Sequence, residues 1–191
     1  MLANRLAPDA NILSFGCSTG EELLSLRRLM PAARLTGVEI NPRARRLAAS
    51  RTAHDPLTEV VETLPRGPFD AVLALAVLQR EPHRVEAEGI IDLARLYPFV
   101  RFDTALSALV DRLAEAGLLA VIHAQYRVED SSAAPHLEPL PGTPPLDPPL
   151  FDRESRRYDP APPSASLFRK CAAISAPSSN SAASDQVRAT R

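Results

Sequence analysis

A loop of small residues near the start of the chain has the residue types and spacing of a ligand-binding turn. Residues 12–15 form a short apolar run that predicts a buried strand, and residues 21–29 predict a helix. Between them lies Gly-Cys-Ser-Thr-Gly, residues 16–20. Glycines at a strand-to-helix junction permit positive φ and let a ligand approach the backbone closely. The loop is therefore predicted to cradle a nucleotide or another cofactor.

Glu39 supplies the second chemical signal. It lies near the end of another predicted strand, residues 34–40, about one strand–helix–strand unit after the loop. A charge there is costly unless it is solvated or paired. A carboxylate at this place typically binds ribose hydroxyls. The loop and Glu39 together predict a ribose-containing cofactor, and a merely solvated carboxylate is the alternative.

The pattern of apolar runs predicts the elements that must position these residues. Strands are predicted at residues 12–15, 34–40, around 60–61, 69–78 and 118–123. Helices are predicted over residues 21–29, from Pro42 onward with Asn41 as the N-cap, and over 85–96 and 99–116. This alternation predicts an α/β fold, a doubly wound and mainly parallel sheet with helices on both faces. The ligand should bind at the carboxyl ends of the strands.

Proline content changes the character of the chain after residue 126. Ten of the 19 prolines lie between Pro135 and Pro163, which excludes a central strand there. We interpret residues 127–165 as a loop region, either over the carboxyl edge of the sheet or partly disordered. Residues 166–170 predict a final strand. One domain over residues 1–170 and a disordered tail over 171–191 are expected.

Composition limits the partners. The chain has 191 residues, with 45% hydrophobic residues, 24% charged residues and a net charge of -1. A net charge this close to zero gives no overall electrostatic attraction to nucleic acid or to an anionic membrane. No apolar run reaches the ~18 residues of a membrane span, and no signal peptide is visible. Because Cys17 and Cys171 are isolated, a reducing compartment is indicated, and we expect a cytoplasmic protein.

Five segments in the right order resemble the class I S-adenosylmethionine-dependent methyltransferases. Residues 11–22 match the first motif of that family, 36–41 the acidic second motif, 69–79 and 113–122 the fourth- and fifth-strand motifs, and 166–170 the last strand. The first motif departs from the family pattern at Ser14, where an acid is usual, and at Ser18, where a glycine is usual. The resemblance covers about residues 8–170. It implies a Rossmann-like fold, S-adenosylmethionine as cofactor and methyl transfer to an acceptor.

The resemblance also implies roles for individual residues. Gly16, Cys17, Ser18 and Gly20 would approach the methionine part of the cofactor, and Glu39 would bind the ribose. Ile40, Glu62 and Thr63 would approach the adenine, and Ala74, Leu75 and Ala76 would line the methionine end. Apart from the resemblance, Cys17 is better explained as a small residue that fills the loop than as an activated thiolate.

Methyl transfer from a sulfonium needs mainly proximity and orientation. A base is required only if the acceptor must lose a proton, and His123, Tyr126 and His83 are the candidates. A structural, hydrogen-bonded role is the alternative for each. The scattered histidines indicate no metal site. Arg43, Arg45, Arg46 and Arg51 are interpreted as a solvated helix face. The acceptor, expected to be a small molecule, and the oligomeric state are left open.

Two other functions stay open at this point. A nicotinamide-dependent Rossmann oxidoreductase would need a Gly-x-Gly-x-x-Gly loop for the pyrophosphate, which Ser18 and Gly20 fit poorly. A catalytically inactive, methyltransferase-like domain could instead bind a partner through the proline-rich segment. Titration with the cofactor separates this second alternative from the enzyme.

Overall fold

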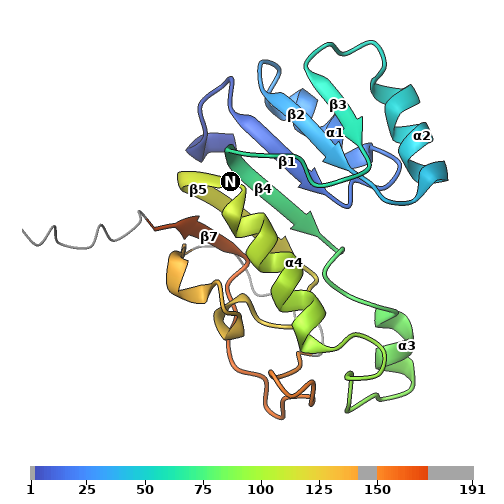
Figure 1. The fold of residues 1–191 in the computed structure, drawn as a ribbon, viewed down its shortest axis with the longest axis vertical. Helices are drawn as coiled ribbons and strands as arrows, with labels where there is room; N and C mark the ends of the chain where they lie inside the picture. The colour runs from blue at the N-terminus through green and yellow to red at the C-terminus, as the bar shows by residue number, and fades with distance from the viewer. Residues whose placement is uncertain (1–2, 142–149, 172–191) are drawn as a thin grey trace, which may run out of the picture.

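Seven strands form one sheet in the computed structural model, which describes residues 3–141 and 150–171 (Figure 1). The strands are β1 (Asn11–Phe15), β2 (Arg34–Val38), β3 (Thr58–Val61), β4 (Phe69–Leu75), β5 (Leu113–Ile122), β6 (Leu137–Pro139) and β7 (Leu167–Lys170). Their order is β3-β2-β1-β4-β5-β7-β6. β1 to β5 pair in parallel, whereas β7 runs antiparallel to its neighbours β5 and β6. The predicted doubly wound, mainly parallel sheet is confirmed.

Helices cover both faces of this sheet. They are α1 (Glu21–Leu29), α2 (Pro42–Thr52), α3 (Pro82–Ala87) and α4 (Phe99–Asp111), with 3₁₀ turns at Ala3–Arg5, Val128–Asp130 and Ala134–His136. Successive strand residues point to opposite faces, so Ile12 packs with Leu23 of α1, whereas Leu13 belongs to the cluster around Phe102 of α4. Strands buried on both faces explain why the predicted strand sequences are almost continuously apolar.

Local sequence signals place α1 and α2. The observed α1 has the predicted bounds. At α2, the Asn41 side chain accepts hydrogen bonds from the backbone N–H groups of Arg43, at 2.9 Å, and Ala44, at 3.3 Å, and Pro42 is the first helical residue. The N-cap prediction is therefore confirmed. The order of strands reverses between β1 and β4, which places the crevice of an open α/β sheet at the carboxyl ends of these two strands.

The helix predicted over residues 85–96 is wrong in its extent. The observed α3 begins at Pro82, where the fixed φ of proline suits the first helical position, and it ends at Ala87. Gly89 has a φ of 59° and turns the chain. Leu93, within the predicted helix, is fully buried in an irregular segment instead.

The boundary between α4 and β5 also differs from the prediction. The helix predicted over residues 99–116 ends at Asp111, and β5 starts at Leu113 rather than at Leu118. The register of β5 against β4 shifts between Phe69 and Ala71, and Ala116 has a φ of 58°. Gly117 therefore lies in a bulge within the strand, not in a turn before it.

The proline-rich region is not a featureless loop where the structure describes it. β6 contains Pro139, and it lies at the edge of the sheet, the position at which a strand tolerates proline. Phe151 and Ser155 are buried. Of the predicted tail only Cys171 is described, and the domain boundaries stay a prediction. Among the described residues, no helix is long and apolar enough to cross a membrane.

Candidate cofactor site

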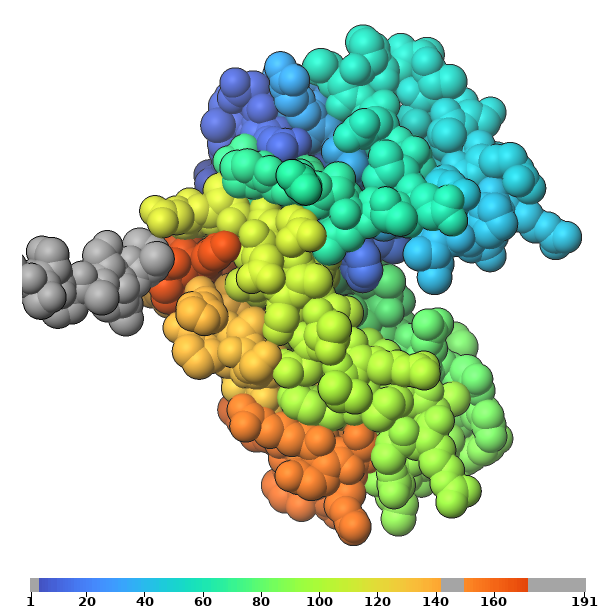
Figure 2. Space-filling view, viewed as in Figure 1, coloured from blue at the N-terminus to red at the C-terminus, as the bar shows by residue number. Residues whose placement is uncertain are grey.

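A cleft of about 330 Å³ opens where β1, β2 and β4 end. It is lined by residues that follow or end these three strands, namely Phe15, Gly16, Ser18, Val38, Glu39, Ile40, Ala76, Val77, Gln79 and Arg80. Figure 2 shows an indentation between the blue half of the molecule, which carries β1 and β2, and the green segment that follows β4. The cleft thus occupies the switch point of the sheet and has the volume of a small-molecule site.

Gly16 lets the loop after β1 approach the segment after β4. Its φ is 79°, and a methyl group on it would lie 2.4 Å from Val77 Cγ2. Any larger residue would push the two sides of the cleft apart or strain the backbone. Gly20, with a φ of 90°, is held against α2, because a methyl group there would lie 3.1 Å from Ala48 Cα.

The backbone N–H groups of Gly16, Cys17 and Ser18 in the loop donate hydrogen bonds to acceptors within the protein. Those of Gly16 and Cys17 both donate to the Val38 carbonyl oxygen, at 2.8 and 3.0 Å. The N–H of Ser18 donates to Glu39 Oε2 at 3.0 Å. A pyrophosphate-binding loop keeps such groups free for the ligand. The loop is therefore built to close against β2 rather than to surround a phosphate.

Glu39 lies just after β2 and is half-buried. Its Oε2 accepts from Ser18, and its Oε1 accepts from the N–H of Asn41 at 2.7 Å. Each carboxylate oxygen can accept a further hydrogen bond, so the group retains capacity for two donors of a ligand. The neighbouring Ile40 side chain is 72% exposed at the rim of the cleft and offers an apolar surface.

Arg45 holds the segment that carries Glu39. Its Nη1 donates to the carbonyl oxygens of Glu39, at 2.9 Å, and Ile40, at 3.3 Å, and its Nη2 donates to Glu62 Oε2 at 3.1 Å. The interpretation of the α2 arginines as a solvated face is therefore wrong for this residue. Glu62 is engaged in this ion pair and does not line the cleft.

Arg51, also on α2, holds the loop itself. Its Nη1 donates to the Thr19 carbonyl oxygen at 2.9 Å and to a carboxylate oxygen of Glu21. Hydrogen bonds from Thr19 and Arg51 lower the pKa of Glu21 to about 2. No sequence signal distinguished Arg45 and Arg51 from the other arginines of α2, because their partners come from distant parts of the chain.

The structure brings five of the predicted cofactor residues to the cleft. The cleft is lined by Gly16, Ser18, Glu39, Ile40 and Ala76 but not by Cys17, Gly20, Glu62, Thr63, Ala74 or Leu75. Sequence reasoning did not select Val77, Gln79 and Arg80, although each follows β4 at the same sheet edge. The rule that ligands lie beyond strand ends would have found them, had the end of β4 been placed at Leu75.

Cys17 is a packing residue of the loop. It is buried, and its Sγ lies 2.8 Å from the position of a methyl group on Gly37. Burial, with added contributions from Glu39 and Glu22, raises the pKa of the Cys17 thiol to about 11. A thiol with this pKa is protonated at neutral pH and is a poor nucleophile.

Tyr126 does not lie where a general base would have to be. The residue is 1% exposed, and its hydroxyl donates to the Tyr97 carbonyl oxygen at 2.5 Å and shares a hydrogen bond of 2.9 Å with the Ser155 hydroxyl. Burial raises the pKa of Tyr126. Its ring packs against those of Tyr97, Phe99 and Phe102 with centroids 5.3 to 5.8 Å apart. The contacts assign Tyr126 to the core.

His123 follows β5 and is exposed, with a φ of 55°. The carbonyl oxygen of the preceding Ile122 accepts from the N–H of Ala76, which lines the cleft, at 2.8 Å. His123 therefore lies beside the end of β4. His83 is exposed on α3 and does not line the cleft.

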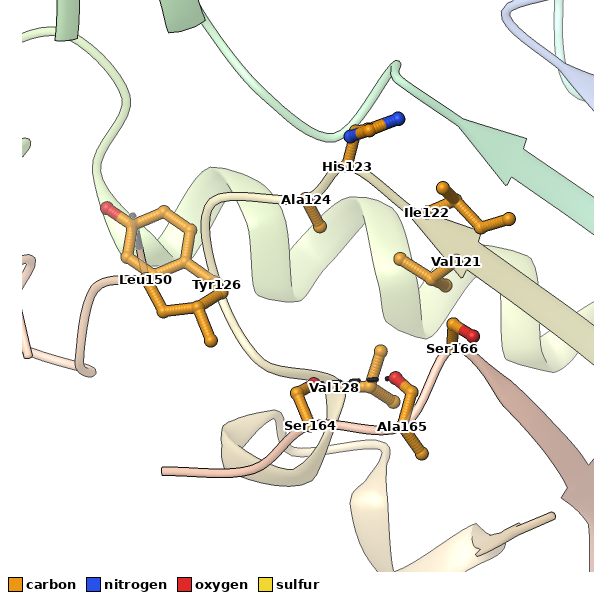
Figure 3. Close-up of a pocket in the computed structure, with 10 residues that line it drawn as sticks. All are labelled: Val121, Ile122, His123, Ala124, Tyr126, Val128, Leu150, Ser164, Ala165 and Ser166. Atoms are coloured by element: carbon orange, nitrogen blue, oxygen red, sulfur yellow. Dashed lines mark hydrogen bonds between the residues drawn. The ribbon is translucent and has the colours of Figure 1, made fainter. Parts of the chain in front are cut away.

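A second, much smaller cavity lies beyond the end of β5. It has a volume of about 30 Å³, and it is lined by Val121, Ile122, His123, Ala124, Tyr126, Val128, Leu150, Ser164, Ala165 and Ser166. Figure 3 shows the His123 ring pointing away from Ser164 and Ser166. This volume suits a water molecule or two and is too small for an acceptor. Among the described residues, no group of three or more His, Cys, Asp or Glu side chains could hold a metal ion.

Comparison with known proteins finds a family match for part of the chain. Residues 13–88, from β1 to just past α3, match a family model described as methyltransferase domain. A search of the curated proteins found no match.

Among solved structures, the chain is similar to coclaurine N-methyltransferase bound to N-methylheliamine and SAH. The TM-score is 0.48 and the identity 13%, over 61% of this chain and 31% of that chain. PKMT2 from Rickettsia typhi has a TM-score of 0.46 and 20% identity, over 61% and 21%. A SAM-dependent methyltransferase from Geobacter sulfurreducens in complex with S-adenosyl-L-homocysteine has a TM-score of 0.45 and 13% identity, over 63% and 44%. The chain thus spans 21% to 44% of the length of these three structures.

The matched residues contain the loop, Glu39 and β4, which together make up the cleft. The order of strands, the motifs and the family model agree with one another. Over residues 13–88, the chain is therefore similar to the methyltransferase domain family.

Proposed function

We propose that the protein is an S-adenosylmethionine-dependent methyltransferase that acts on a small-molecule acceptor in the cytoplasm. The observation that carries the proposal is the Glu39 carboxylate, which closes the loop through Ser18 and keeps acceptor capacity toward the cleft. A ribose diol supplies two donors that match this capacity. The net charge of -1 and the two free cysteines support a small acceptor and a reducing compartment.

The cleft fits a ligand with a positive charge better than one with a pyrophosphate. The N–H groups of Gly16, Cys17 and Ser18 already have acceptors within the protein. Glu21 and Glu22 occupy the first turn of α1, where their charge disfavours an anion. These observations favour a sulfonium cofactor over the dinucleotide of the nicotinamide-dependent alternative.

S-adenosylmethionine, when bound, supplies a methyl group on a sulfonium that is already electrophilic. The residues of the cleft bind and orient it and exclude water. Glu39 would hold the ribose, and the exposed Ile40 side chain would cover the adenine. Gly16 and Val77, in close approach, would confine the methionine end from two sides.

His123 is the residue proposed to accept a proton from the acceptor. It is exposed and follows Ile122, which pairs with the cleft-lining Ala76. Tyr126 takes no part in this proposal, because its hydroxyl is buried and hydrogen-bonded in the core. Cys17, Gly20, Ala74 and Leu75 would support the cleft rather than touch the cofactor.

Calorimetric titration of the protein with S-adenosylhomocysteine tests the proposal. We expect saturable binding with one site per chain, whereas NADH and NADPH give no heat. Absence of binding at millimolar ligand, by protein whose circular dichroism shows it folded, would contradict it. Binding without methyl transfer to any member of a panel of acceptors would favour the inactive binding domain.

A further inference from the structure

Arg80 brings a positive charge to the cleft, after the end of β4. Its side chain is exposed, and among the described residues no salt bridge joins it to a carboxylate. The adjacent Glu81 pairs with Arg84 instead. Glu39, which also lines the cleft, accepts from backbone N–H groups of its own side of the cleft. The guanidinium of Arg80 is therefore available to a ligand.

A buried amide fixes the backbone of Arg80. The Gln125 side chain is 1% exposed, its Oε1 accepts from the N–H of Arg80 at 2.8 Å, and its Nε2 donates to the Arg80 carbonyl oxygen at 2.9 Å. The backbone of Gln125 is held in turn by Leu78 and Phe151. A buried amide is costly unless it is hydrogen-bonded, and here both of its ends bind one residue. The core thus sets the position of Arg80, although its side chain is exposed.

The segment that holds Arg80 also carries the proposed base. Gln125 follows His123 by two residues, and the preceding Ile122 accepts from the N–H of Ala76 at 2.8 Å. The chain after β4 is therefore tied to the chain after β5 at two points, Ala76 and Arg80. Because β1 lies between β2 and β4 in the sheet, this wall of the cleft is separated from the wall that carries Glu39. One wall thus has a carboxylate and the other a guanidinium.

We propose that Arg80 binds an oxyanion of the acceptor, a carboxylate or a phosphate group, and so selects an anionic small molecule as substrate. The inference rests on the proposed function and names the substrate class of the same site. A guanidinium presents its N–H donors in a planar fork that matches two oxygens of such a group. The contacts with Gln125 fix the backbone from which this fork extends, which lowers the ordering cost of binding.

Titrations of the protein saturated with S-adenosylhomocysteine test the inference. The probes are benzoate and phenyl phosphate, which carry the two oxyanions on an apolar ring, and benzamide is the neutral counterpart. Phe15 and Val77 line the cleft and suit such a ring. Ligand-observed NMR measures affinities in the range expected for probes of this size. We expect benzoate, phenyl phosphate or both to bind more tightly than benzamide, and the tighter of the two anions identifies the oxyanion.

Arg80→Gln removes the charge and leaves the backbone contacts with Gln125 in place. We expect the affinity for the bound anion to fall roughly 10-fold or more, as for the loss of a hydrogen bond to a charged group. The affinity for S-adenosylhomocysteine should change less than about twofold. Arg80→Lys keeps the charge without the planar fork and should lose less than Arg80→Gln. Arg46→Gln is the matched control and should change neither affinity, because Arg46 is also exposed, has no salt bridge among the described residues and lies on α2 outside the cleft.

Three results would overturn the inference while the proposed function stands. They are an anion affinity that Arg80→Gln leaves unchanged, binding of benzamide as tight as that of both anions, and absence of anion binding by the protein saturated with S-adenosylhomocysteine. A loss of S-adenosylhomocysteine affinity in Arg80→Gln as large as the loss of anion affinity would assign Arg80 to the cofactor, and it would overturn the inference as well. If the wild-type protein does not bind S-adenosylhomocysteine, the proposed function fails and the inference fails with it.

Discussion

The Glu39 carboxylate accepts a hydrogen bond from the backbone N–H of Ser18 at 3.0 Å, and this contact ties the end of β2 to the loop after β1. The same carboxylate accepts from Asn41, the N-cap of α2. A single side chain thus fixes the loop, the start of a helix and one wall of the cleft. Because these contacts lie within the protein, they hold the carboxylate in place, and less ordering on binding lowers the cost of binding.

Glu39→Gln should weaken S-adenosylhomocysteine by roughly 10- to 100-fold, the range for losing hydrogen bonds to a charged group. The amide has one acceptor oxygen, so it can serve Ser18 or Asn41 but not both. Isothermal titration calorimetry measures the change. Glu62→Gln is the control, since the Glu62 side chain is 65% exposed and, among the residues that the structure describes, pairs only with Arg45. An equal loss in both variants would contradict the role of Glu39.

Gly16→Ala should abolish measurable cofactor binding and lower stability. The new methyl group would lie 2.4 Å from Val77 Cγ2, and the φ of 79° is unfavourable for alanine by roughly 1–2 kcal/mol. The double variant Gly16→Ala with Val77→Ala removes the clash and keeps the backbone strain. We therefore expect it to recover part of the stability lost in Gly16→Ala, as measured by urea unfolding. No recovery would mean that the contact with Val77 is not what requires glycine.

The elements around the cleft could be predicted from the sequence when their signals are local or periodic. Asn41 and Pro42 mark the start of α2, and the apolar runs around Leu13 and Val72 mark strands buried on both faces. The contacts of Arg45 and Ser155 were not predictable, because their partners are close only in the folded chain. Tertiary packing also determines the role of Tyr126. This residue follows a strand, a position at which catalytic residues are common, but its side chain is buried in the core.

Tyr126→Phe tests the assignment of this residue to the core. The change leaves the Tyr97 carbonyl oxygen without its donor, so we expect a loss of about 1–3 kcal/mol in the free energy of unfolding. Chemical denaturation measures it. The affinity for S-adenosylhomocysteine and kcat at 25 °C should change less than about twofold. A large fall in kcat with unchanged stability would restore Tyr126 as a catalytic candidate.

His123→Asn tests the proposed base. Asparagine tolerates the φ of 55° at this position, so the variant should keep its fold and its affinity for S-adenosylhomocysteine. Removal of a general base lowers kcat by roughly 10²- to 10⁴-fold. The exposed His83, replaced by Asn in the same way, is the control and should leave kcat unchanged. An active His123→Asn enzyme would show that the acceptor needs no base at this position.

The contribution of Glu22 to the free energy of unfolding should fall as pH rises. A salt-bridged carboxylate has the opposite effect, because its contribution increases with pH. Because burial raises the pKa of Glu22 in the folded state, the folded protein holds this proton more tightly than the unfolded chain, whose glutamates titrate near ~4.3. The contribution of the protonated group is fully present below that value and is lost as pH rises through the raised pKa of Glu22.

Glu22→Gln cannot titrate, so its stability relative to the wild type should increase as pH rises from 4 to 8. Urea unfolding across this range measures the difference. Glu21→Gln is the matched control on the same helical turn, and it should show the reverse trend, which falls mainly below about pH 5, because hydrogen bonds from Thr19 and Arg51 lower the pKa of Glu21 to about 2. A pH-independent difference between Glu22→Gln and the wild type would show that Glu22 is not desolvated in the folded protein.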